Sequence, residues 1–261
     1  MTFDYPIAFS AIKLIGIFAR VGAFTLALPI FNSQIISGQY KMFFILMISI
    51  ILMPVIPSNW ISYELFQDMD LFKLTFFLFS EALLGLTVAL VVLIVIEVFN
   101  LGGELIDRDV GFSMAQVVDP ASDINNSLFS AFFVQIFYIM FIILDGHNEI
   151  IRMAAASFET LPPGEFLATK ELADAVLLLS AQVFVAGLQI SMPVVVTMLL
   201  ISIALGLLAR IGEDFEVLMI SFPVKMGLSF IILMWTFPIV LSFCRRMTEE
   251  TIAWIQFIIK A

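Results

Sequence analysis

The chain has 261 residues, of which 62% are hydrophobic and only 13% are charged. A soluble globular domain carries about 45–50% apolar and about 25% charged residues, so this chain lacks the polar side chains needed to cover its own surface. The composition excludes an ordinary cytosolic enzyme, a disordered protein and a disulfide scaffold, and it predicts an integral membrane protein or a protein packed as one.

The net charge and the rare residue types narrow the function classes further. The net charge is −10, which argues against a basic nucleic-acid-binding face. Cys244 and His147 each occur once, which excludes a disulfide and a multi-histidine metal site, and no cofactor is expected. The N-terminal segment does not resemble a cleavable signal peptide, because Asp4 stands where a basic residue is expected and Lys13 and Arg20 interrupt the apolar run.

Six apolar segments approach or exceed the length of a transmembrane helix, which is about 20 residues. They are residues 7–31, 42–56, 72–99, 127–144, 175–210 and 217–243. The fifth has room for two short crossings, and Pro193 near its middle predicts a kink or the turn of a hairpin. The sequence therefore predicts an all-α, polytopic membrane-type fold of six to eight helices, in one domain over residues 1–261.

Ionisable side chains inside the apolar segments need a physical account, because a charge in hydrocarbon is costly. Lys13 and Arg20 are seven residues apart and share one face of the first segment. Glu81, Glu97 and Lys225 lie in later segments. One interpretation is a conduit or a proton relay. The interpretation we favour is pairing between helices, with Lys13 or Arg20 against Glu81.

Motifs of the common enzyme classes are missing. His147 has no second histidine to form a zinc-protease motif, and the chain has neither a G-x-S-x-G nucleophile elbow nor a glycine-rich phosphate loop. His147 follows Gly146 at the end of a segment, where a capping or hydrogen-bonding role is expected. The sequence predicts a protein without catalytic activity.

The linker 100–126 carries apolar side chains that a loop exposed to water should not hold together. They are Phe112, Met114, Val117 and Val118, with Ser113 among them. Such a loop between rigid helices can plug a pore, since hydrophobic constrictions block ions by dewetting and Met adapts to irregular partners. A re-entrant or interfacial loop packed on its own helices is the alternative, and the residues leave both open.

Glycine and proline positions predict how this linker turns. Gly111 frees the backbone at the start of the apolar residues. Pro120 can open the next helix, with Asp119 as its cap. Gly102 and Gly103 precede these turns and form the predicted hinge of the linker.

Several short motifs then follow one another in order. They are residues 111–120 (GFSMAQVVDP), Gly146-His147, Ser157-Phe158, Leu161-Pro162, Pro193, residues 204–210 (ALGLLAR) and Ser221-Phe222-Pro223. In this order and spacing they resemble the FliR family, the R subunit of the flagellar type III export gate, and its injectisome counterparts. One departure is residues 212–216 (GEDFE), where the family usually has a Pro-Gln-hydrophobic-Asn stretch.

The resemblance implies a subunit of a helical assembly with P-type and Q-type subunits (FliP and FliQ), in contact with FlhB and next to FlhA. It implies helical hairpins similar to a P subunit joined to a Q subunit, in the bacterial inner membrane and flagellar basal body, with helices lifted above the membrane plane. Unfolded export substrates would pass through the centre of this assembly. The segment matching residues 106–122 resembles the family's plug.

The resemblance and the residues together assign expected roles. The expected gate residues are Phe112, Ser113, Met114, Val117 and Val118. Structural or packing roles are expected for Lys13, Arg20, Glu81, His147, Pro193, Gly206, Arg210 and Pro223.

Two other function classes stay open at this point. A virulence injectisome uses similar gate subunits, so the motifs do not separate the two systems. A small secondary transporter would place Pro193 beside a substrate site, with Glu81 or Lys225 as a coupling group. Such a transporter should purify alone and bind a small ligand, whereas a gate subunit should need its partners.

Overall fold

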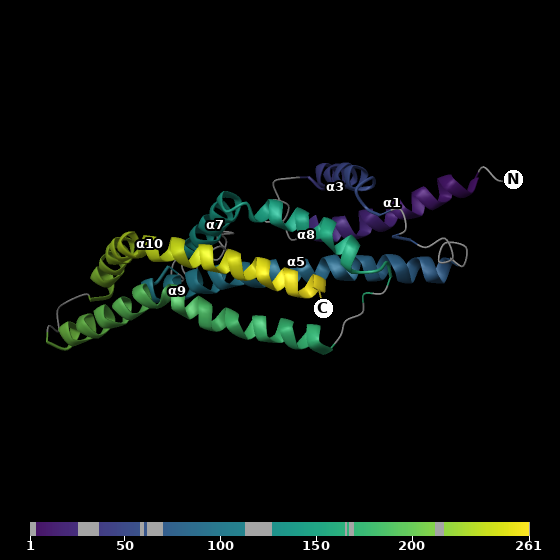
Figure 1. The fold of residues 1–261 in the computed structure, drawn as a ribbon. Coiled ribbons are helices and arrows are strands. Elements are labelled where there is room, and N and C mark those ends of the chain that lie inside the picture. The colour runs from purple at the N-terminus through teal and green to yellow at the C-terminus, as the bar shows by residue number, and fades with distance from the viewer. Residues whose placement is uncertain are drawn as a thin grey trace. The chain divides into compact units, whose positions relative to one another are not determined.

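The computed structural model describes residues 4–25, 37–57, 60–61, 70–112, 127–164, 166, 170–211 and 217–260. Within these ranges the chain forms seven helices and no strand, as Figure 1 shows in chain order. The helices are α1 (Asp4–Thr25), α3 (Gly38–Leu52), α5 (Leu71–Val110), α7 (Leu128–Ile143), α8 (Gly146–Thr160), α9 (Lys170–Ile211) and α10 (Val217–Lys260). The prediction of an all-α fold with six to eight helices is confirmed.

Several helices differ from the predicted segments. Helix α10 extends to Lys260 instead of ending at residue 243, and α8 forms in a stretch outside the six segments. Helix α5 continues past residue 99 as far as Val110, so the first part of the predicted linker 100–126 is helical. Helix α9 is continuous through Pro193 over 42 residues, and the hairpin turn considered at this proline is wrong. A proline removes one backbone hydrogen bond, and neighbouring groups make this loss tolerable in long apolar helices.

The chain divides into two compact units, each built from separate stretches of sequence. Unit 1 comprises residues 1–93, 142–177 and 248–261. Unit 2 comprises residues 94–141 and 178–247. The description of residues 1–261 as one domain stays a prediction.

Unit 1 has a core in which α1 packs against α3 and α8. Helix α8 forms from an amphipathic stretch whose buried positions follow the helical period: Ile150, Met153, Ala154, Ser157 and Phe158. Phe158 meets Trp60 edge-on, with the ring centroids 5.0 Å apart. Trp60 also contacts Phe77 of α5 at 6.1 Å, so the aromatic rings join the helices to the segment after α3.

Unit 2 is organised by a phenylalanine stripe on α7. The buried rings of Phe129, Phe133, Phe137 and Phe141 recur every four residues and therefore share one face of the helix. Phe137 stacks on Phe99 of α5, with the ring centroids 4.6 Å apart. The stripe explains why this segment is a helix and which of its faces is buried.

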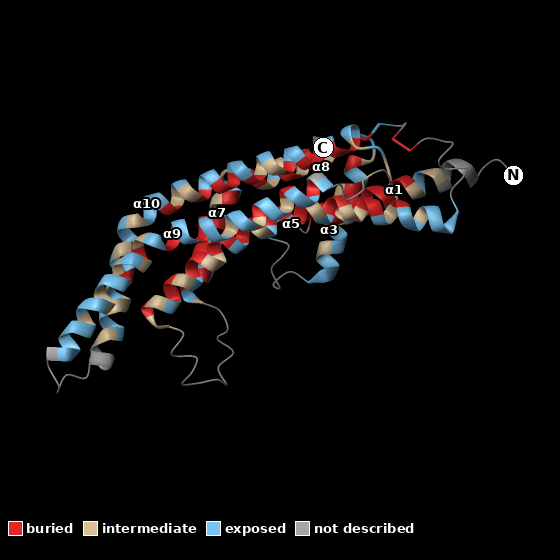
Figure 2. Ribbon diagram, turned by 90° about the horizontal axis from the view of Figure 1, so that it is seen from below, coloured by how far each residue is buried: buried red, intermediate tan, exposed pale blue. Residues whose placement is uncertain are grey.

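Much of the remaining apolar surface is exposed within the chain, as the pale blue stretches of α9 and α10 show (Figure 2). By length and composition, α5, α9 and α10 can each cross a membrane, and the pair α7 and α8 would be a fourth span if counted as one. The most apolar stretch of α5 is 61% buried inside the chain, against 11% in α9 and 28% in α10. The membrane-type prediction is confirmed, and most of the apolar stretch of α9 is exposed among the described residues.

Replacing Gly85 of α5 with alanine should destabilise the chain. The added Cβ would lie 2.8 Å from the carbonyl oxygen of Arg20 and 2.9 Å from the amide nitrogen of Phe24, both in α1. Overpacking of this kind costs about 1–3 kcal/mol. The matched control is Gly206→Ala in α9, where no atom lies within 4 Å and helix propensity favours alanine by about 1 kcal/mol. Thermal unfolding of the purified variants measures the difference, and equal melting temperatures would contradict the close approach of α1 and α5.

Candidate functional site

The residues predicted to form the gate follow the end of α5. Among the gate and turn residues named from the sequence, a group lies outside the described residues: Ser113, Met114, Val117, Val118, Asp119 and Pro120. The described flanks, residues 111–112 and 127–130, show how unit 2 holds the two ends of the segment 113–126.

Helix α5 ends at a glycine cap. Gly111 has a φ of 99°, a conformation that L side chains rarely adopt. The backbone N–H groups of Gly111 and Phe112 both donate to the carbonyl oxygen of Asp107, each at 3.0 Å. The left-handed glycine thereby lets the chain leave the helix while the Asp107 carbonyl accepts both hydrogen bonds.

Phe112 is anchored by two other phenylalanines. Its ring lies edge-on to Phe129 at the start of α7, with the centroids 5.9 Å apart, and edge-on to Phe222 of α10 at 5.8 Å. Edge-to-face pairs of this kind are each worth about 0.5–1.5 kcal/mol beyond the burial of their area. The predicted gate residue Phe112 therefore has a defined seat between α7 and α10.

The first turn of α7 is held by side chains from α5. The Ser127 hydroxyl accepts a hydrogen bond from the Ser130 N–H at 3.1 Å, which is an N-cap. The Asp107 carboxylate accepts bonds from the Ser127 hydroxyl and, at 3.0 Å, from the Phe129 N–H. The Ser130 hydroxyl donates to the side-chain oxygen of Asn100 at 2.8 Å. We call these five residues the α5–α7 clamp.

The two glycines of the predicted hinge lie inside α5, not in a linker. A Cβ on Gly103 would collide with the backbone of Phe129 and Ser130, so this position must lack a side chain for α7 to approach. A Cβ on Gly102 would lie 3.3 Å from the carbonyl oxygen of Gly187 in α9 and would collide with Ile190. The structure thus places both glycines at close helix contacts, and the hinge role stays a prediction.

Two further ionisable residues of the apolar segments, Lys225 and Glu97, lie in unit 2 and form hydrogen bonds with nearby groups. Lys225 of α10 donates from Nζ to the backbone carbonyl of Asp109 at 3.2 Å, which adds a third element to the end of α5. Glu97 is exposed and accepts a bond from the Asn100 side chain at 3.1 Å. A relay between Glu97 and Glu81 finds no support in these contacts.

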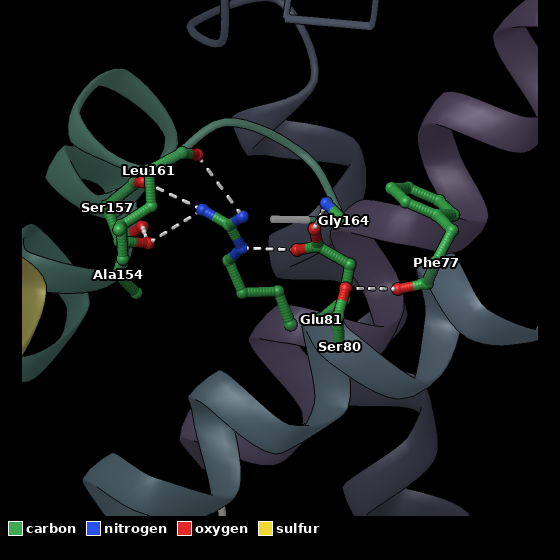
Figure 3. A network of polar contacts seen from close by, with 8 residues as sticks. Phe77, Ser80, Glu81, Ala154, Ser157, Leu161 and Gly164 are labelled. Carbon is green, nitrogen blue, oxygen red and sulfur yellow. Dashed lines mark hydrogen bonds and ion pairs between the residues drawn. The ribbon is translucent and has the colours of Figure 1, made fainter. Parts of the chain in front are cut away.

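A buried ion pair organises unit 1. Arg20 of α1 and Glu81 of α5 are each only 1% exposed, and the Arg20 Nε lies 2.5 Å from the Glu81 Oε2. The other Arg20 nitrogens donate to the carbonyl oxygens of Ser157 at 2.7 Å and Leu161 at 3.5 Å (Figure 3). Glu81 accepts a further bond at 3.0 Å from the N–H of Gly164, so the pair joins α1, α5, α8 and the turn after α8 (Figure 3).

Aromatic rings flank the same guanidinium. The Arg20 Cζ lies 4.4 Å from the centroid of Phe158 and 5.4 Å from that of Trp60. Of the two pairings predicted for Glu81, the structure shows the one with Arg20. Lys13 instead donates to the carbonyl oxygens of Ile56 at 3.1 Å and Pro57 at 3.2 Å. Both cations are therefore used to join segments of unit 1.

The remaining residues expected in structural roles take no part in the contacts described for these two sites. Pro193 is half-buried inside α9, Gly206 and Arg210 are exposed near its end, and Pro223 is exposed inside α10. His147 is half-buried at the start of α8, and its buried Nδ1 has no hydrogen-bond partner among the described residues. The described part of the chain also holds no group of three or more His, Cys, Asp or Glu side chains suited to a metal ion.

Sequence reasoning missed Asp107. This residue is 4% exposed. It lies on the same face of α5 as Gly103, which precedes it by one helical turn. A signal was present, because Asn100, Gly103 and Asp107 follow a helical spacing of three and four residues. The ionisable residues around Asp107 instead favoured a linker.

Removing one partner of the Arg20–Glu81 pair should destabilise unit 1 strongly. Arg20→Met or Glu81→Leu leaves a buried charge without its partner, at a cost of about 3–5 kcal/mol. The double variant Arg20→Met/Glu81→Leu should be less damaging than either single variant, because no uncompensated charge remains. The exposed pair Arg152–Glu149 is the control, since Arg152→Ala should change stability by less than about 1 kcal/mol. Chemical denaturation of the purified chain measures these values, and additive single effects in the double variant would contradict the coupling.

Comparison with known proteins extends these observations. Residues 11–251 match the family described as bacterial export proteins, family 1. A relative called flagellar biosynthetic protein FliR from Pectobacterium carotovorum subsp. carotovorum is 25% identical over 236 residues, covering 89% of this chain and 87% of the relative. The protein of that name from Escherichia coli (strain K12) is 24% identical, with 88% and 86% covered. That from Bacillus subtilis (strain 168) is 24% identical, with 90% of each covered. The chain belongs to the bacterial export proteins, family 1, which confirms the resemblance to the FliR family that its motifs indicate.

Proposed function

We propose that this protein is a subunit of the bacterial flagellar type III protein export gate and forms part of the channel for unfolded export substrates. The family match across residues 11–251 carries the proposal. The relatives described above are named for flagellum biosynthesis, which favours the flagellar system over an injectisome and over a secondary transporter. Several helices long and apolar enough to cross a membrane agree with a membrane protein.

The proposed partners are the P-type and Q-type subunits FliP and FliQ, together with FlhB and FlhA. Exposed apolar side chains along α9 support a role in a larger helical assembly, because this surface needs an apolar environment that the chain itself does not supply. The proposed location is the bacterial inner membrane and the flagellar basal body, where the surrounding subunits and lipid would cover these helices.

Co-purification tests this assignment. A tagged copy of the chain, expressed with its neighbouring export subunits and extracted in mild detergent, should retain the P-type and Q-type subunits through affinity and size-exclusion steps. The chain expressed alone should give lower yield and a lower melting temperature, since α9 then lacks its cover. A chain that purifies alone with full stability and binds a small solute would contradict the gate and favour the transporter.

Within the gate, we assign the plug to the region matching residues 106–122, with Phe112, Ser113, Met114, Val117 and Val118 as its sealing residues. Residues 106–110 belong to α5, so the sealing part begins at the glycine cap. The seat of Phe112 between Phe129 and Phe222 supports the assignment, because a seal needs a fixed attachment to rigid helices. An apolar constriction of this type blocks ions by excluding water.

Deleting residues 113–118 should make the closed gate leak. This deletion leaves Gly111 and Phe112 in place, so the end of α5 keeps its cap while the apolar side chains are lost. Cells expressing the complex with the deletion should become permeable to small solutes and ions, as uptake of a small dye and loss of potassium would measure. Val117→Ile/Val118→Ile is the matched control, because it retains an apolar surface and should keep the seal. Unchanged permeability in the deletion variant would contradict the assignment of this segment as the plug.

A further inference from the structure

We propose that Asp107 is a positioning residue that fixes both ends of the segment 113–126. Its backbone carbonyl accepts the N–H groups of Gly111 and Phe112, and its carboxylate accepts the Ser127 hydroxyl and the Phe129 N–H. One residue thus closes α5 and opens α7. What the segment does rests on the proposed function, whereas the tie between its ends rests on these hydrogen bonds alone.

A chain of 14 residues does not by its length alone fix the distance between its two ends. The segment 113–126 has 14 residues, which can extend over about 45 Å. Bringing such ends to one place costs chain entropy, and side-chain contacts have to offset that cost. The α5–α7 clamp supplies them, since α5 and α7 meet there through hydrogen bonds as well as apolar packing.

The carboxylate suits this position better than an apolar side chain. The first N–H groups of a helix have no partners within the helix, and the helix dipole favours a negative charge beside them. Ser127 satisfies the Ser130 N–H, and Asp107 satisfies the Phe129 N–H from the neighbouring helix. Hydrogen bonds to a charged acceptor are about twice as strong as neutral ones.

The clamp also specifies how closely and in which register the helices meet. Gly103 lies one turn before Asp107 and leaves room for the α7 backbone, and Asn100 lies a further turn back and receives the Ser130 hydroxyl at 2.8 Å. A shift of α7 along α5 would break the contacts of Asn100 and Asp107 together. The burial of Asp107, which is 4% exposed, keeps water from competing for these bonds.

The test uses hydrogen–deuterium exchange on the assembled, detergent-extracted complex carrying Asp107→Ser. The amides of residues 129–133 should exchange about ten-fold faster or more, because a charged capping interaction is lost. Residues 148–158 of α8 should exchange as in the unchanged protein, which excludes general unfolding. Glu104→Ser is the matched control, since this acidic side chain is on the same helix but exposed. The same cells are tested for permeability to a small dye, which should rise with Asp107→Ser and not with Glu104→Ser.

A variant in which the two side chains are swapped distinguishes a positioning role of Asp107 from a general loss of packing. In Asp107→Ser/Ser127→Asp the carboxylate moves to the N-cap position of α7, and a hydroxyl on α5 can donate to it. This double variant should recover at least half of the lost exchange protection and should restore the seal. A purely packing role for position 107 predicts no recovery.

Each result decides the proposal. Faster exchange with a leak, both reversed by the double variant, supports it. Unchanged hydrogen exchange at residues 129–133 in Asp107→Ser would contradict the proposed contact between Asp107 and the first turn of α7. Suppose that Asp107→Ser exchanges faster but the cells stay impermeable to the dye. If deletion of residues 113–118 makes the cells leak, this result contradicts the positioning role of Asp107. If that deletion does not leak, the plug assignment fails instead, and the exchange result alone decides whether Asp107 joins α5 to α7.

Discussion

A guanidinium and a carboxylate share the interior of unit 1, each only 1% exposed. Removing such groups from water costs several kcal/mol per ion, and the hydrogen bonds around the pair have to offset this cost. Arg20 takes two carbonyls from α8 and the residue after it, and Glu81 takes the N–H of Gly164. The two aromatic contacts of Arg20 complete the site. The ion pair therefore joins α1, α5 and α8 of unit 1 beside the apolar core that these helices share.

The pairing of Glu81 with a cation could be predicted, because the cost of burying a charge can be recognised from a single residue in an apolar segment. A carboxylate inside an apolar segment requires a cation, and the first segment offered Lys13 and Arg20. Sequence alone does not choose between them, since the choice depends on which side chain meets α5 across the helix contact. Lys13 instead donates to the backbone carbonyls of Ile56 and Pro57, where the chain leaves the turn after α3.

The end of α5 could not be predicted from local signals. Two adjacent glycines and four ionisable residues between positions 100 and 110 are typical of a linker, and propensity favours ending the helix there. The contacts of unit 2 override that preference. Gly102 and Gly103 allow α9 and α7 to approach, and Asp107 is buried at the start of α7, so the residues that weaken the helix locally create its contacts with α7 and α9.

The apolar composition requires an apolar environment, which can be lipid or other protein. The small residues of α9 help to distinguish these two. Large aliphatic side chains suffice for a helix surrounded by lipid, whereas close contact between helices needs small residues. Near its exposed end α9 contains Ala204, Gly206 and Ala209 among leucines. Gly206 has open space around it within the chain, and a glycine there costs the helix about 1 kcal/mol relative to alanine. Lipid offers nothing specific to offset that cost, but a neighbouring helix packed against the glycine does, which favours protein as the cover of this part of α9.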